Sequence, residues 1–147
     1  MPRARKDPRH RAREAALQIL YQWDIGKGDV DLASATLFDR QWPDTDPPAG
    51  DLRAFATDLA RETTRRLGDI DALIADTARR WRPERMAILD RLILRMAVCE
   101  MLRDVSTPPA VVINEALELA RTFTTEESVK FINGMLDAIR KKLDALR

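Results

Sequence analysis

The sequence predicts an all-α protein, and three of its properties support this. The 147 residues are 45% hydrophobic and 33% charged but only 5% aromatic, and Ala, Leu and Arg are abundant. These residues lose little conformational entropy on entering a helix. Apolar residues recur three and four positions apart along most of the chain, whereas no interior segment alternates with period two. The length suits one compact domain. We therefore expect about seven helices.

The first helix is predicted over residues 9–24. Its apolar residues fall on one stripe that we expect to be buried, namely Ala12, Ala16, Ile19, Leu20 and Trp23. Arg9 and Arg13 are four residues apart, and we expect both on the exposed side of this helix. Gly26 and Gly28 follow the stripe and predict its end.

Three further helices are predicted between residues 31 and 80. A short one covers residues 31–40. The segment 41–50 contains three prolines and a glycine, which excludes a helix and predicts a surface loop. A helix over residues 52–67 follows, with Gly68 as its C-terminal cap, and the next covers residues 70–80.

The last three helices include the one that we expect to be most buried. This fifth helix is predicted over residues 84–102, with Pro83 in its first turn, because apolar residues cover much of its circumference. A sixth helix ends at Phe123. The seventh continues to the C-terminus, and Thr124 is predicted to cap it while Glu127 reaches back in a capping box.

The basic residues are concentrated at the N-terminus. Residues 1–13 carry six basic side chains against the single acidic Asp7, whereas the rest of the chain holds 19 basic and 23 acidic side chains. We predict a flexible basic arm over residues 1–8 that binds a polyanion, followed by a single all-helical domain over residues 9–147. The alternative is a solvated tail that only aids solubility.

The composition argues against several functional classes. No apolar run approaches the roughly 18 residues of a membrane span, and no apolar segment follows the N-terminal charges. One His and one Cys provide neither a dyad with an orienting partner nor a multi-cysteine metal site. We therefore expect a cytoplasmic protein without enzymatic activity, cofactor or metal. Cys99 lies in an apolar stretch, which predicts a buried thiol.

Two residues depart from the helical pattern. Tyr21 lies off the apolar stripe of the first helix, where its ring can stack on an unpaired base or complete the edge of the core. Gly134 lies inside the last helix, where it costs about 1 kcal/mol relative to Ala. We expect either the fifth helix or a ligand strand to approach its backbone closely.

Three segments resemble the NusB family of transcription antitermination factors. Residues 11–23 are similar to its opening helix, and residues 93–101 to its central helix. The most specific match is a two-part motif with the family's spacing: Ile113-Asn114-Glu115-Ala116 in one helix, and after a short turn Lys130-Phe131-Ile132-Asn133-Gly134-Met135-Leu136-Asp137 in the next. The similarity extends over nearly the whole chain except the loop at residues 41–50.

The resemblance implies both a fold and a function. It implies an all-helical fold of two packed helical sub-bundles. It also implies an RNA-binding protein that pairs with the small-subunit ribosomal protein NusE on single-stranded boxA RNA. With other Nus factors and RNA polymerase, that complex supports processive rRNA transcription.

The resemblance also assigns the candidate site residues. The arginine-rich RNA-binding segment of the family corresponds to Arg9, His10, Arg11 and Arg13, and its other RNA contacts correspond to Tyr21, Glu127 and Phe131. We add Arg5 and Lys6 of the arm, and Lys130. Asp90 takes the place of an acidic residue on the partner-binding side. The sequence departs from the family at Thr124, Glu127 and Val129, where Gly, Asp and His are frequent.

Three alternatives remain open. NusB-like modules also form the N-terminal part of some rRNA cytosine methyltransferases, but no methyl-donor domain is expected here because the chain stops at Arg147. A pure protein-interaction scaffold would use the bundle without RNA. Homodimerisation, which some family members show, is compatible with the sequence.

Overall fold

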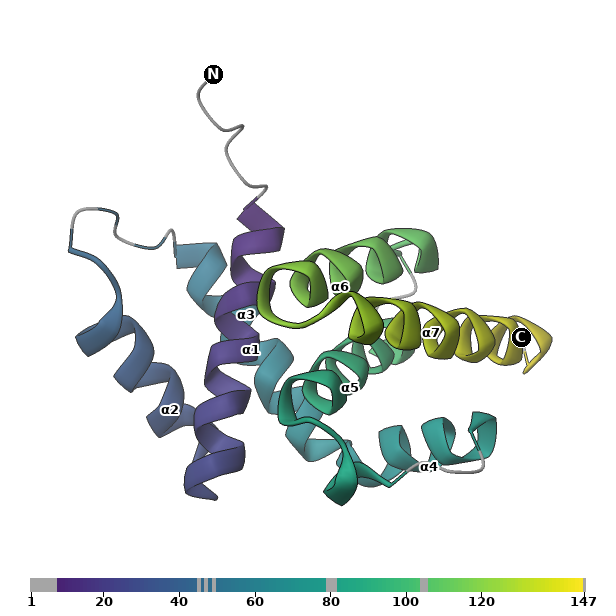
Figure 1. Cartoon of the computed structure of the whole chain (residues 1–147). Coiled ribbons are helices and arrows are strands. Elements are labelled where there is room, and N and C mark those ends of the chain that lie inside the picture. Colours follow the sequence, from purple (N-terminus) through teal and green to yellow (C-terminus); the bar gives the residue numbers. More distant parts are fainter. Residues whose placement is uncertain are drawn as a thin grey trace. The chain divides into compact units, whose positions relative to one another are not determined.

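The computed structural model describes residues 8–44, 46, 48, 50–78, 82–103 and 106–146. Within these ranges every regular element is helical and no strand is present, so the expected all-α class is confirmed. Residues 1–7, including Arg5 and Lys6 of the expected arm, lie outside the described residues. The chain divides into two compact units, residues 1–61 and 62–147, which correspond to the two expected sub-bundles. Figure 1 shows the helices of both units.

The first unit contains the helix that carries most of the candidate residues. Its elements are α1 (Pro8–Gly26), α2 (Val30–Thr36), the π-helix η1 (Leu37–Gln41) and α3 (Gly50–Arg65), whose last residues enter the second unit. Helix α1 packs against α2 and η1. Its predicted stripe is buried except for the half-buried Trp23, so burial of apolar surface fixes which side of α1 faces inward.

Polar contacts determine where α2 begins and how it meets α3. The Asp29 carboxylate caps α2 by accepting a hydrogen bond of 2.7 Å from the backbone N–H of Asp31, as an N-cap aspartate commonly does. The hydroxyls of Ser34 and Thr57 lie 2.7 Å apart in a buried contact. This contact satisfies two polar groups that would otherwise be costly to bury.

In the second unit the other helices surround α5. The elements are α4 (Leu67–Thr77), the 3₁₀ turn η2 (Pro83–Arg85), α5 (Ile88–Arg103), α6 (Pro109–Phe123) and α7 (Glu126–Leu146). Helix α5 packs against α4, α6 and α7, and its ten consecutive residues from Leu92 to Met101 are all buried. The prediction that this helix is the most buried is confirmed.

Charged pairs join α4 to its neighbours in this unit. Arg95 of α5, itself buried, donates two hydrogen bonds of 2.9 and 2.8 Å to the carboxylate of Asp71. The two hydrogen bonds compensate the free-energy cost of burying the guanidinium away from water. Lys142 of α7 pairs with Asp76 of α4. Together the two pairs fix the position of α4 against α5 and α7.

Two predicted helix boundaries are wrong. Gly68 does not cap the preceding helix but is the second residue of α4. Only Arg66, which has non-helical backbone angles (φ −101°, ψ 20°), separates α3 from α4, so the chain turns without a left-handed glycine. Pro83 does not lie in the first turn of α5 but begins η2, and α5 starts at Ile88.

The predicted cap of the last helix is displaced by one residue. Thr125, and not Thr124, precedes α7 and accepts a hydrogen bond of 3.1 Å from the backbone N–H of Ser128. The Thr124 hydroxyl instead donates to the carbonyl of Ala120 at the end of α6. Glu127 is therefore the second residue of α7 and does not form the predicted capping box.

Candidate nucleic-acid interface

Arg9 and Arg13 lie over the same aromatic ring. Their guanidinium carbons are 4.2 and 5.5 Å from the centroid of Phe55 in α3. Their spacing of four residues places both side chains on one side of α1, and in the structure this side faces Phe55. Arg9 remains exposed, but Arg13 is only 5% exposed. The expectation that Arg13 lies on the exposed side is therefore wrong: its side chain is buried, with the guanidinium close enough to the Phe55 ring for a cation–π contact.

The other two basic candidates on α1 are also held by neighbouring side chains. His10 is 8% exposed, and its Nε2 lies 2.9 Å from Oε1 of Glu14 one turn along the helix. Arg11 donates a hydrogen bond of 2.6 Å to the Asp46 carboxylate, and its guanidinium carbon is 5.6 Å from the Trp42 ring centroid. Of the four candidates, Arg9 and the partly exposed Arg11 present their charge to solvent.

Tyr21 is placed at the surface of α1. Its side chain is 41% exposed, so its ring does not complete the core, although part of it is covered. Tyr21 follows Glu14 by about two helical turns and therefore projects from the same side of α1 as Glu14. A partly covered ring keeps a fixed orientation and still offers a surface for stacking.

The candidates of the second unit form a separate group on α7. Glu127, Lys130 and Phe131 are all exposed, and their spacing of three and four residues places them on one face of the helix. Phe131 is 43% exposed, so part of its ring is accessible to a ligand. Acidic, basic and aromatic groups thus lie together at the start of α7.

Gly134 continues this face by one turn. It is exposed, and a Cβ atom at this position would meet no described atom within 4 Å outside its own helix. The expectation that the fifth helix approaches this glycine closely is therefore wrong. The backbone of α7 beside Phe131 is open to solvent.

Asp90, the candidate for partner binding, is engaged inside its own unit. Its Oδ2 accepts a hydrogen bond of 2.9 Å from the Ser128 hydroxyl, which joins α5 to α7. Its Oδ1 is buried and has no hydrogen-bond partner in the described part of the chain. Burying a carboxylate oxygen without a hydrogen-bond partner is unfavourable. The position of Asp90 at the start of α5 therefore lowers the stability of this unit.

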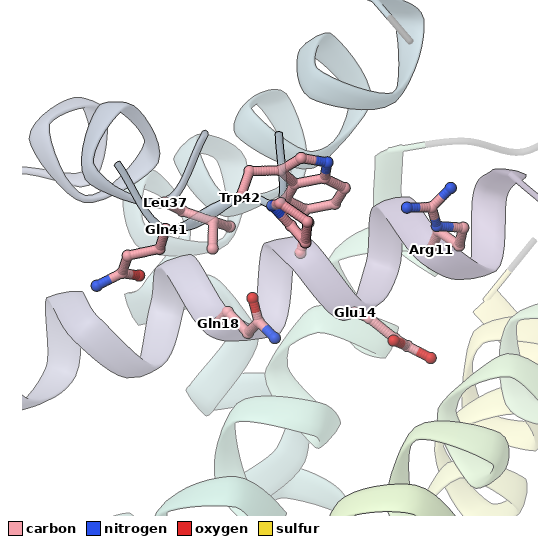
Figure 2. A pocket seen from close by; sticks show the side chains of 8 residues that line it. Arg11, Glu14, Gln18, Leu37, Gln41 and Trp42 are labelled. Atoms are coloured by element: carbon pink, nitrogen blue, oxygen red, sulfur yellow. The ribbon is translucent and has the colours of Figure 1, made fainter. Parts of the chain in front are cut away.

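One feature of the site was missed by sequence analysis. A hollow of about 230 Å³ lies between α1 and η1, lined by Arg11, Glu14, Ala15, Gln18, Leu37, Gln41, Trp42 and Pro43. Figure 2 shows Arg11, Glu14 and Gln18 on α1, with Leu37, Gln41 and Trp42 across from them. The one available signal was a tryptophan beside a proline in a segment otherwise interpreted as a polar loop.

The described residues show little that suggests chemistry. Among them, no group of three or more His, Cys, Asp or Glu side chains is placed to hold a metal ion. Cys99 is fully buried, as expected, and burial raises the pKa of its thiol, which disfavours the reactive thiolate. No helix in the described ranges has the length and apolar character needed to cross a membrane.

The fold and the site define a class: small all-helical proteins that display arginines and an aromatic ring along their first helix. The model of the NusB family matches residues 10–141. The transcription antitermination protein NusB of Koribacter versatilis is 45% identical over 139 residues, which cover 95% of this chain and 92% of that protein. The corresponding protein of Solibacter usitatus is 47% identical, with 92% and 90% covered. The chain belongs to the NusB family.

Solved structures agree with this assignment. The structure of T. maritima NusB superposes with a TM-score of 0.81 at 32% identity and covers 93% of each chain. The structure of the antitermination factors NusB and NusE in complex with double-stranded RNA gives a TM-score of 0.78 at 26% identity, with 92% of this chain and 97% of that chain covered.

Proposed function

We propose that the protein is a transcription antitermination factor that binds single-stranded boxA RNA together with the ribosomal protein NusE. The observation that carries the proposal is the α1 surface, where Arg9, Arg11 and Tyr21 are accessible on one helix of a NusB-family chain. Cations for phosphates and a ring for a base are the two elements of single-strand recognition.

The arginines and the tyrosine have different roles in RNA recognition. Arg9 attracts the backbone, and Arg11 does so where a phosphate replaces its Asp46 partner. Each phosphate that they neutralise releases counterions without reading sequence. Tyr21 lies ten residues after Arg11, a rise of about 15 Å along the helix. An RNA strand that runs along α1 therefore meets the arginines first and the ring of Tyr21 further along. Stacking on this ring provides the preference for unpaired bases.

The exposed face of α7 supplies a second set of contacts. Lys130 offers a further cation, Phe131 a further ring, and Glu127 an acceptor for base N–H groups. The open backbone at Gly134 lets a strand pass close to this helix. We propose that this face also contacts RNA.

The partner assignment rests on the relationship to solved complexes. A NusB that is 26% identical to this chain has been solved with NusE and double-stranded RNA, and more than nine-tenths of each chain is covered. We propose that NusE binds this chain too, near Asp90 at the start of α5. The complex then joins the other Nus factors on RNA polymerase in the cytoplasm, and the protein acts by binding without catalysing a reaction.

Fluorescence anisotropy tests the proposal. Labelled boxA RNA and a scrambled control are titrated with the protein alone and with NusE added. We expect tighter binding of boxA than of the scrambled RNA, and a further increase in affinity with NusE. Absence of binding to either RNA at low salt would contradict the proposal and favour a protein-interaction scaffold.

A further inference from the structure

The hollow between α1 and η1 has an apolar floor and an aromatic wall. Ala15 and Leu37 form its buried floor, and Trp42 stands at its side (Figure 2). The indole is held in place because its Nε1 donates a hydrogen bond of 2.7 Å to the carbonyl of Asp46 and its ring lies 5.0 Å from that of Phe38. A fixed ring loses little entropy when a ligand stacks on it.

Two amide side chains in the hollow have hydrogen-bonding capacity left over. The Oε1 of Gln41 accepts a bond of 2.8 Å from Gln22, which leaves the amide nitrogen of Gln41 with no partner among the described residues. The side chain of Gln18 is exposed and has no hydrogen-bond partner among the described residues. Between them these amides offer donors and an acceptor.

The charges around the hollow do not favour a phosphate. Arg11 is neutralised by Asp46 at 2.6 Å, and the carboxylate of Glu14 lies on the α1 side of the hollow. An anion would meet this carboxylate without gaining a free cation. A neutral ligand with polar edges fits the lining better.

The size of the hollow also limits the ligand. A volume of about 230 Å³ is below the roughly 300–1,000 Å³ of pockets that bury drug-sized molecules. One planar ring system fits. The π-helix η1 ends at Gln41, directly before Trp42, and such helices are rare and frequently lie at functional sites.

We propose that this hollow is a subsite for one unpaired base of the bound RNA, which stacks against Trp42 while Gln18 and Gln41 bind its edge. The inference rests on the proposed function. Gln18 precedes Tyr21 by three residues, so the subsite and the tyrosine lie on neighbouring parts of the same side of α1, about 4.5 Å apart along its axis. Adjacent bases of one strand can reach both.

A double-mutant cycle between protein and RNA tests the subsite. BoxA RNAs with an abasic site at each position in turn are titrated by anisotropy into the wild type and into Gln18→Ala and Trp42→Ala. The side chain of Gln18 makes no internal hydrogen bond in the described structure, so its variant retains the fold even if Trp42→Ala does not. Asn114→Ala removes an exposed amide on α6 and is the matched control.

The subsite predicts a coupling at one position of the RNA. There the abasic site weakens binding to the wild type about ten-fold, as expected for the loss of one stacked base, and weakens binding to Gln18→Ala and Trp42→Ala much less. Asn114→Ala behaves as the wild type.

The other outcomes overturn the proposal in distinguishable ways. If RNA binds but no abasic position couples to Gln18 or Trp42, the subsite is wrong and the proposed function stands. If Gln18→Ala weakens binding of NusE and leaves RNA binding unchanged, the hollow is a protein contact. If no RNA binds to the wild type, both proposals fail.

Discussion

The side chain of Tyr21 is 41% exposed, and we propose that the exposed face of its ring contributes to RNA binding. We expect Tyr21→Ala to lower boxA affinity more than ten-fold while the helical circular dichroism stays unchanged, since a stacked base is lost and the core is not opened. Tyr21→Phe keeps the ring and should retain most of the affinity. Equal binding by Tyr21→Ala would show that the ring serves packing alone.

Arg9 and Arg13 contact the same ring but differ in exposure, so their replacement should have different effects. Arg13→Ala uncovers Phe55 and should lower the free energy of unfolding by about 1–3 kcal/mol, measured by urea denaturation. Arg9→Ala should cost less than about 1 kcal/mol but weaken RNA binding. If Arg13→Ala leaves stability intact and reduces only RNA affinity, the buried position of this guanidinium is wrong.

At the scale of the element, the start of α7 depends on one hydroxyl. The Thr125 side chain accepts from the N–H of Ser128, and losing such a cap typically costs about 1 kcal/mol. We expect Thr125→Ala to lower the thermal midpoint, whereas Glu127→Ala, which removes no cap, leaves it nearly unchanged. A larger loss for Glu127→Ala in the same calorimetric comparison would restore the predicted capping box.

Gly134 makes α7 less stable than an alanine at the same position would. An added methyl group meets no described atom within 4 Å outside the helix, so Gly134→Ala should raise the free energy of unfolding by about 1 kcal/mol. If RNA passes over this face, the same variant lowers RNA affinity in the anisotropy titration. A destabilised Gly134→Ala would mean that another part of the molecule approaches this backbone.

At the scale of the whole molecule, a net charge of only +1 provides no general attraction for RNA. The attraction must come from local arginines, and for single-stranded RNA each neutralised phosphate contributes about −0.7 to the slope of log affinity against log salt. We expect the Arg9→Ala/Arg11→Ala double variant to reduce the slope by about 0.7 for each arginine that meets a phosphate.

Lys141→Ala serves as the control for this salt titration. Lys141 is highly exposed near the end of α7 and pairs with Asp137 one turn earlier. Its removal changes the net charge by one unit but should leave the slope as it is. A similar slope for all three proteins would show that neither arginine meets a phosphate.

The sequence by itself determined the class of the fold and the order of the helices. The stripe from Ala12 to Trp23 and the broad apolar surface of α5 are periodic signals that depend only on local spacing. The two-part motif around Asn114 and Asn133 was likewise sufficient to indicate the NusB family. The boundaries predicted at Gly68 and Thr124 were wrong, because neighbouring residues compete for a cap and the choice depends on the exact path of the chain.

Only the tertiary structure decided which candidate side chains are accessible. Sequence periodicity assigns Arg13 to a polar face, but its side chain is buried beside the ring of Phe55, 42 residues away in the chain. The same holds for the hollow at Trp42, whose lining comes from two segments that share no local pattern. Helical periodicity is a property of neighbouring residues, whereas burial and pockets arise from residues that are distant in sequence and adjacent in space, and these contacts form only when the chain has folded.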